Sequence, residues 1–157
     1  MIDHPGRREP RFPPQLESNV AQAIYEKVNE LKPGCGLSSA ACGADILFLE
    51  AMLDRSAEIS IVLPYEKEQF LRESVDFIPD SNWQSRFDRL VSIATRVIVA
   101  SPQRLEVGGV SYEFGNRLLL GLATIRARQL DTRLIPLAVW DGMLGDGPGG
   151  TASMIEN

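Results

Sequence analysis

Three short runs of β-forming residues alternate with longer helical segments, and this alternation is the strongest constraint on the fold of the chain. The run Glu58 to Leu63 (EISIVL) is almost continuously apolar and stops at Pro64, as expected for an interior strand of a parallel sheet. Arg96 to Ala100 (RVIVA) and Leu134 to Trp140 are predicted to be the next two strands. Strands separated by helices of ten or more residues favour an α/β sandwich with a mainly parallel sheet.

Apolar residues spaced three or four apart predict the helices. The first helix is expected to begin near Pro14 and to end at the Pro33-Gly34 pair. The segment that follows, from Cys35 to Asp45, consists almost entirely of small residues and leads into the next helix without a strand of its own. Further helices are expected over residues 46–53, 66–73, 83–94 and 112–130.

Residues 1–14 (MIDHPGRREPRFPP) contain four prolines and three arginines and are predicted to form an extended arm. A single α/β domain is expected over residues 15–157. An open sheet of this kind normally begins with a strand, whereas the first regular element here is a helix. We therefore expect the chain to be part of a longer polypeptide whose first strand precedes Met1.

Composition excludes several classes of protein. Of 157 residues, 44% are hydrophobic and 24% are charged, which is typical of a globular domain. No apolar run approaches the roughly 20 residues of a membrane span and no secretory signal opens the chain, so we expect a cytoplasmic protein. The net charge of −5 argues against direct binding of nucleic acid or of an anionic membrane. One histidine and two cysteines are too few for a zinc site, and no metal or resident cofactor is predicted.

Two glycine-containing segments are the candidates for an anion site. In open parallel sheets, ligands bind beyond the carboxyl ends of the strands, against helix N-termini whose amides are free. The first segment, Gly36 to Gly43, adds the hydroxyls of Ser38 and Ser39; the second is Gly145 to Thr151. Glycine also forms ordinary turns and close helix contacts, so a purely structural role remains the alternative for both.

Other residues near these segments are weaker candidates. Tyr112 and Glu113 are expected at the start of a helix on the same side of the sheet, where a simple acidic helix start is the alternative interpretation. Asp45 suits a ribose-hydroxyl acceptor or a helix-dipole partner better than an acid–base pair with Glu50. Cys42 beside a helix N-terminus is either a thiol of lowered pKa or a small packing residue.

The segment Leu37 to Asp45 (LSSAACGAD), the apolar helix after it and Glu58 to Pro64 (EISIVLP) resemble the SMF/DprA–LOG (SLOG) superfamily of Rossmann-like nucleotide-binding domains. Pro148 to Thr151 is similar to the PGGxGTxxE motif of its LOG branch. Most of the chain also resembles an uncharacterised bacterial SLOG-like group found with cyclase-type and tetratricopeptide-repeat signalling proteins. The resemblance implies a Rossmann-like three-layer sandwich.

The resemblance also implies a set of nucleotide-binding residues. They comprise a serine- and glycine-rich loop with its aspartate, a phosphate side in the glycine-rich tail, and the N-terminal arm as a mobile clamp. With the helix-start candidates above, the predicted site is Arg7, Gly36, Ser38, Ser39, Gly43, Asp45, Tyr112, Glu113, Gly149, Gly150 and Thr151.

The sequence departs from the LOG motif at one chemically important position. LOG-type phosphoribohydrolases need a glutamate three residues after the motif threonine, and Met154 stands there. We therefore expect a sensor that binds a nucleotide or nucleotide-derived signal and passes its occupancy to a neighbouring domain or a second subunit. An enzyme that splits the N-glycosidic bond of a nucleotide and a protein-interaction module with a vestigial pocket remain the alternatives.

Overall fold

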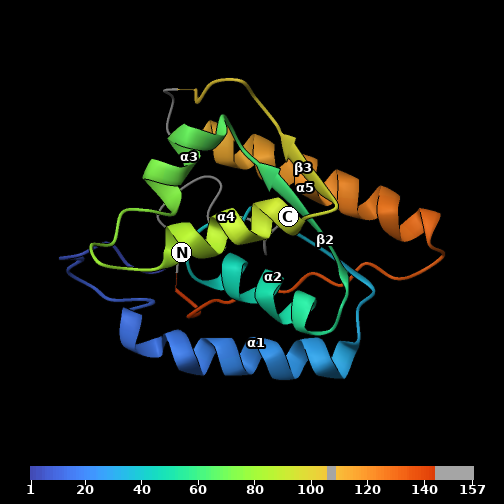
Figure 1. Cartoon of the computed structure of the whole chain (residues 1–157), viewed down its shortest axis with the longest axis horizontal. Helices are drawn as coiled ribbons and strands as arrows, with labels where there is room; N and C mark the ends of the chain where they lie inside the picture. Colours follow the sequence, from blue (N-terminus) through green and yellow to red (C-terminus); the bar gives the residue numbers. More distant parts are fainter. Residues whose placement is uncertain (106–108, 144–157) are drawn as a thin grey trace.

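The structure, a computed structural model, describes residues 1–105 and 109–143. A three-stranded sheet lies between helices on both of its faces (Figure 1). A short 3₁₀ helix (Pro14–Leu16) precedes the other elements. These are α1 (Glu17–Leu31), β1 (Cys35–Ser38), α2 (Ala44–Asp54), β2 (Glu58–Leu63), α3 (Lys67–Ser74), α4 (Trp83–Ile93), β3 (Arg96–Val99) and α5 (Val110–Gln129).

The sheet is entirely parallel, with β2 between β1 and β3. Gly36 is in register with Ile59, and Ile61 is in register with Val97. Five of the six residues of β2 are buried, as expected for a strand with helices on both faces. The predicted interior strand and the Rossmann-like α/β fold are therefore confirmed.

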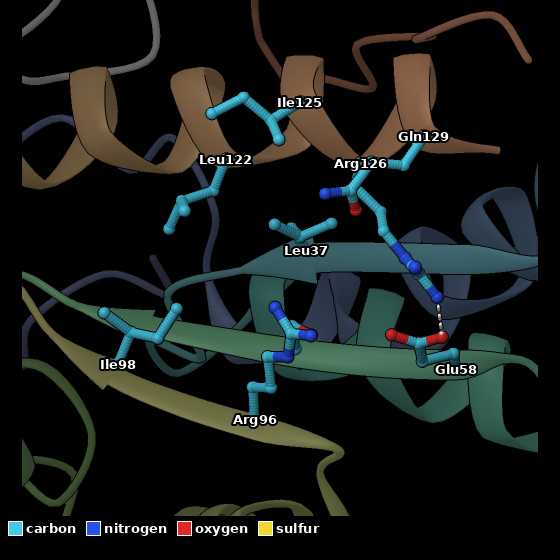
Figure 2. A pocket seen from close by; sticks show the side chains of 9 residues that line it. Leu37, Glu58, Arg96, Ile98, Leu122, Ile125, Arg126 and Gln129 are labelled. Carbon is cyan, nitrogen blue, oxygen red and sulfur yellow. Dashed lines mark hydrogen bonds and ion pairs between the residues drawn. The ribbon is translucent and has the colours of Figure 1, made fainter. Parts of the chain in front are cut away.

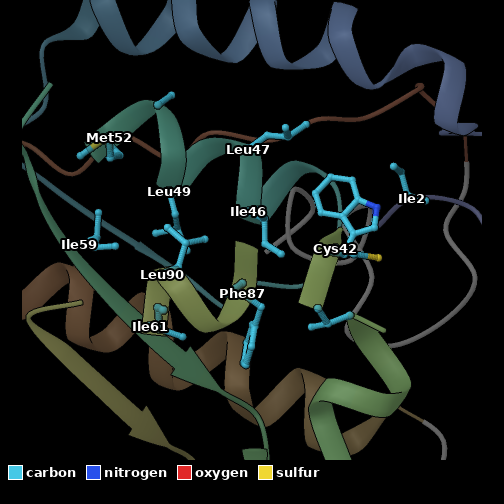
Figure 3. Close-up of a cluster of buried hydrophobic side chains, with 14 of the residues drawn as sticks. Ile2, Cys42, Ile46, Leu47, Leu49, Met52, Ile59, Ile61, Phe87 and Leu90 are labelled. Carbon is cyan, nitrogen blue, oxygen red and sulfur yellow. The ribbon is translucent and has the colours of Figure 1, made fainter. Parts of the chain in front are cut away.

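The main hydrophobic core lies on the face of the sheet covered by α2 and α4. Ile46 of α2, Ile61 of β2, and Phe87 and Leu90 of α4 are all buried in one cluster (Figure 3). Helix α1 packs outside this layer, against α2. The helices predicted over residues 46–53, 66–73 and 83–94 are confirmed with small shifts of their ends.

An arginine of α4 ties the three helices of this layer together. The Arg86 guanidinium donates to both carboxylate oxygens of Glu50 in α2, at 2.8 and 2.5 Å, and to Glu17 of α1 at 2.7 Å. It also stacks over the Trp83 ring at 4.1 Å from the ring centre. Two carboxylates and an aromatic face therefore hold the one guanidinium group, which fixes the relative positions of α1, α2 and α4.

Helix α5 covers the other face and presents small residues to the sheet. Its buried positions are Ser111, Gly115, Ala123 and Ala127, spaced by multiples of four along the helix. A Cβ atom at Gly115 would lie 2.9 Å from the Cβ and 3.1 Å from the Cα of Pro64. The close approach of α5 to the end of β2 therefore depends on the missing side chain.

Two sequence predictions about strands were wrong. Cys35 to Ser38, taken as part of a loop, is strand β1. Its composition is poor for a strand, but β2 supplies its hydrogen bonds, and Gly36 leaves room for Phe48 and Met52 of α2.

The second error concerns residues 134–140, which form no strand. Pro136 has no N–H to donate to a neighbouring strand. The segment pairs with none of the strands that the structure describes, and Ile135 and Trp140 remain about half exposed, at 48% and 45%. An apolar composition alone therefore does not make this segment part of the sheet.

No helix in residues 1–105 and 109–143 is long and apolar enough to cross a bilayer.

Two glycines of α5 provide a matched test of the packing. Gly121→Ala meets no atom within 4 Å, so the gain in helix propensity is expected to stabilise the protein by up to about 1 kcal/mol. Gly115→Ala gains the same propensity but clashes with the Pro64 backbone, and we expect a net loss of about 1–3 kcal/mol. Urea unfolding measures both, and equal effects of the two variants would contradict this account of α5.

Candidate functional site

The loop between β1 and α2, residues 39–43, stands at the carboxyl end of the sheet. Ala40 is buried with a φ of 62°, and Gly43 has a φ of 97°. A non-glycine residue in the left-handed region is uncommon and costs conformational energy, so the surrounding contacts must hold Ala40 in place. Because Gly43 has no side chain to cap the helix, α2 begins without a side-chain cap.

Asp45 braces this loop from the first turn of α2. Its carboxylate accepts a hydrogen bond from the Ala41 amide at 3.3 Å. Desolvation raises the pKa of the Asp45 carboxyl, while the Ala41 amide and the Ser38 hydroxyl act in the opposite direction. Asp45 thus lies beside Ser38 as predicted, but its carboxylate is already engaged by its own loop.

Cys42 is a packing residue of the same loop. Both cysteines are free, Cys42 is fully buried, and burial raises the pKa of its thiol to about 11. The alternative of a thiol with lowered pKa is therefore wrong, because the desolvation of a thiolate outweighs the N-terminal ammonium and the backbone of Ile2, which act to lower the pKa of Cys42.

The N-terminal arm packs over this loop. Ile2 is buried, and its amide donates to the Cys42 carbonyl at 3.1 Å. A Cβ atom at Gly43 would lie only 2.7 Å from the Ile2 nitrogen. The arm is folded back by Asp3, whose carboxylate accepts the amides of Arg11 and Phe12, each at 2.8 Å.

The guanidinium groups of Arg7 and Arg11, both in the arm, each form polar contacts with other residues. The Arg7 guanidinium donates to the Glu9 carbonyl at 3.0 Å and lies 3.6 Å from the Asp3 carboxylate. Arg11 forms a two-pronged ion pair with Asp141, at 2.6 and 2.7 Å, which lowers the pKa of that carboxyl well below its usual range. Arg7, predicted to reach the site, thus lies within the arm that covers it.

A cluster of polar side chains follows β2 at the same edge of the sheet. The Tyr65 hydroxyl donates to Glu73 of α3 at 2.7 Å and lies 2.8 Å from the Tyr112 hydroxyl of α5. Tyr112 also contacts the Ser74 hydroxyl at 3.1 Å. Arg104, in the segment after β3, donates to Glu73 at 2.8 Å. We call these five residues the tyrosine cluster: Tyr65, Glu73, Ser74, Tyr112 and Arg104.

The hydrogen bonds of the tyrosine cluster set its protonation state. Desolvation acts to raise the pKa of Glu73, but hydrogen bonds from Tyr65, Gln69 and Arg104 outweigh it, and the net pKa is lowered. Burial, together with the hydroxyl of Tyr112 and the carboxylate of Glu73, raises the pKa of Tyr65. At neutral pH the Tyr65 phenol is therefore neutral and the Glu73 carboxylate beside the Arg104 guanidinium is ionised.

The loop and the tyrosine cluster are directly joined. The amide of Cys42 in the loop donates to the carbonyl of Ser74 in the cluster at 2.9 Å. The carboxyl ends of β1 and β2 therefore share one polar region, covered on one side by the N-terminal arm. The sequence prediction included Tyr112 but missed Tyr65, Glu73 and Arg104. The sequence signal that could have identified Tyr65 is its position two residues after the predicted strand β2.

Other predicted site residues lie in different surroundings. Gly36 lies inside β1 against α2, where its contribution is to packing. Glu113 lies in the first turn of α5, exposed, and pairs with Arg117 at 2.6 Å. Ser39 is half-buried in the loop. Gly149, Gly150 and Thr151 lie outside the described residues.

Two cavities of the described structure lie away from this edge. One of about 380 Å³ lies between α1 and α2, beside Tyr25 and Asp54. A smaller one of about 60 Å³ lies between the sheet and α5 (Figure 2). Within residues 1–105 and 109–143, no group of three or more His, Cys, Asp or Glu residues is arranged to hold a metal ion.

Comparison of the sequence with models of known protein families finds no match, and comparison with curated proteins finds none either. The parallel sheet between two layers of helices defines the protein as a member of the Rossmann-like α/β class. Because unrelated functions share this fold, the fold alone does not define the function of the site.

The buried carboxyl of Asp45 predicts a pH effect on stability. Its pKa is raised in the folded state, so the fold holds that proton more tightly, and stability falls as pH rises from the ordinary value of 3.8 through the folded pKa. Asp45→Asn keeps a hydrogen-bond acceptor and removes the charge. We therefore expect the variant to gain stability relative to the parent across that interval, and to keep the gain at neutral pH.

Urea unfolding between about pH 4 and about pH 8 measures this difference. Asp54→Asn is the control, because Asp54 is an exposed carboxylate at the other end of the same helix. A gain for Asp45→Asn that does not grow with pH would contradict a desolvated carboxyl.

Proposed function

We propose that the protein binds a nucleotide or a nucleotide-derived signal at the carboxyl edge of its sheet and acts as a sensor module. One observation carries the proposal: the loop after β1 and the tyrosine cluster after β2 are joined by the Cys42–Ser74 hydrogen bond at that edge. In open parallel sheets this edge is the usual place for phosphorylated ligands. The resemblance to SLOG domains supports the same ligand class.

The groups at this edge suit the separate parts of a nucleotide. Ser38 and Ser39 contribute hydroxyls beside the N-terminus of α2, where phosphate oxygens are favoured. Tyr112, which is half-buried, contributes a phenol hydroxyl and ring surface for a sugar or base, and the fully buried Tyr65 packs edge-on against it. Arg104 contributes a guanidinium with 40% side-chain exposure, whose geometry matches two phosphate oxygens.

Glu73 is not suited to act as a general acid, because its lowered pKa keeps the carboxyl ionised at neutral pH. The Asp45 carboxylate is engaged by Ala41 within its own loop. The role that fits both groups is to hold the loop and Arg104 in position, while the arm over the loop responds to occupancy.

A thermal-shift panel of mono-, di-, cyclic and dinucleotides tests this function. A ligand at 100 times its dissociation constant is expected to stabilise the fold by about 2.7 kcal/mol. Arg104→Gln is expected to reduce affinity about tenfold or more, because one charge-assisted contact to phosphate is lost. Arg89→Gln, on the exposed face of α4, is the matched control and is expected to bind normally.

Absence of a shift with every nucleotide would contradict the proposal. Equal binding by Arg104→Gln would place the ligand elsewhere. Gly43→Asp is unsuitable as a test variant, because a side chain there is strained and clashes with Ile2 whether or not a ligand binds.

A second candidate, a protein-interaction module, is favoured by the outer face of α5. Val110 and Phe114 lie one turn apart on the outer face of the helix, remote from its buried small residues, and are 38% and 49% exposed. A helix that is apolar on both faces is typical of one that is covered on both.

The outer face of α5 gives this candidate a direct test. If it is an interaction surface, the protein is expected to self-associate in light scattering as concentration rises, and Phe114→Asp is expected to keep it monomeric. Glu113→Gln, in the adjacent exposed position, is the control. A parent protein that stays monomeric and shows no loss of solubility at high concentration would contradict the candidate.

A further inference from the structure

A second polar site lies at the opposite end of the sheet from the proposed nucleotide site. Figure 2 shows the cavity of about 60 Å³ between α5 and the sheet, with α5 above and the strands below. Its polar residues Glu58 and Arg96 are the first residues of β2 and β3, so the cavity lies at the amino ends of these strands. The side chains of Leu37, Ile98, Leu122 and Ile125 form its apolar walls.

The charges around this cavity do not balance. Arg126 of α5 donates to the Glu58 carboxylate at 2.6 Å, which leaves that carboxylate paired. The Nε atom of Arg126 is buried and has no hydrogen-bond partner. Arg96 also lines the cavity, and its exposed guanidinium group has no hydrogen bond or ion pair with another residue of the described structure. Two guanidinium groups therefore face one carboxylate, which leaves one positive charge in surplus.

The forked donors of the Arg96 guanidinium have no acceptor within the described structure, and a ligand with acceptor oxygens supplies one. A carboxylate matches the forked geometry of a guanidinium and carries a single negative charge, equal to the surplus. The predominantly apolar walls do not suit a dianionic phosphate, whose second charge would remain without a partner.

The size of the cavity limits the ligand further. A water molecule needs roughly 10–15 Å³ on this measure, so about 60 Å³ accepts roughly four to six water-sized groups. That space holds a carboxylate with two or three further carbon atoms and excludes a nucleotide.

We propose that this cavity binds a small monocarboxylate with a short apolar tail. Arg96 binds its oxygens, the Glu58–Arg126 ion pair closes one side of the site, and the tail packs against Ile98, Leu122 and Ile125. This site is independent of the proposed nucleotide site, because it uses none of the residues of the loop or of the tyrosine cluster.

Methyl-labelled NMR of the full chain tests the proposal and locates the ligand. Titration with butyrate is expected to shift the methyl signals of Leu37, Ile98, Leu122 and Ile125 saturably, while 1-butanol and inorganic phosphate leave them unchanged at equal concentration. Arg96→Gln is expected to weaken butyrate binding at least tenfold, since Arg96 is exposed and its loss breaks no described contact. Arg128→Gln is the control, because Arg128 is an exposed arginine of α5 that does not line the cavity, and this variant is expected to bind butyrate as the parent does.

A second variant separates loss of space from loss of charge. Ser60 is buried and lines the cavity, so Ser60→Val is expected to reduce butyrate affinity while both arginines remain. The proposal is overturned if butyrate shifts none of the four methyl signals, if Arg96→Gln binds it unchanged, or if butanol or phosphate produces the same shifts.

Discussion

The double pairing of β2 is the constraint on which the rest of this structure depends. In the described sheet β2 has a parallel neighbour on each edge and a helical layer on each face, so nearly all of its residues are buried. Its direction sets the direction of β1 and β3, and the connections α2 and α4 must then cross on one face. Its two ends also define the two polar regions: Tyr65 and α3 follow its carboxyl end, and Glu58 begins its amino end beside Arg126.

Sequence pattern identified β2 because burial on both faces leaves a nearly continuous apolar run of strand length that is rich in β-branched residues and stops at Pro64. The same reasoning failed for β1, since a strand of four residues with Gly36 at its centre carries almost no β signal. That strand exists because of contacts made by α2 and β2, which no local pattern records. The apolar run at 134–140 misled for the opposite reason. It has the composition of a strand, but Pro136 and the lack of a described partner leave it outside the sheet.

Some residues of the candidate site could likewise be predicted from local sequence, whereas others are recognised only from contacts between residues far apart in the chain. Tyr112 was accessible from sequence because it lies near the start of a helix that follows a predicted strand, so topology places it at the carboxyl edge, whereas Asp45 was suggested by the small-residue segment before its helix and by the SLOG resemblance. The contact of Tyr65 with Tyr112 joins residues 47 apart, and that of Arg104 with Glu73 joins residues 31 apart. Nothing local distinguishes Glu73 from any exposed glutamate of a short helix. Its role follows only when α3, α5 and the segment after β3 are brought together.

The hydrogen bonds to the Glu73 carboxylate bear on how an anionic ligand can bind Arg104 without destabilising the fold. Arg104 is one of three donors to that carboxylate, the others being Tyr65 and Gln69. If Arg104 turns from Glu73 to a phosphate, the carboxylate keeps two hydrogen bonds, so no buried group is left without a partner. The exchange gives the guanidinium a phosphate in place of the carboxylate, and the charge of Glu73 is then stabilised by the neutral donors Tyr65 and Gln69 alone. Arg86 is the contrasting case, since it alone joins Glu17 and Glu50, and its withdrawal would separate three helices. The exposed, replaceable guanidinium of Arg104 is therefore the one suited to ligand exchange, while Arg86 is suited to holding the core.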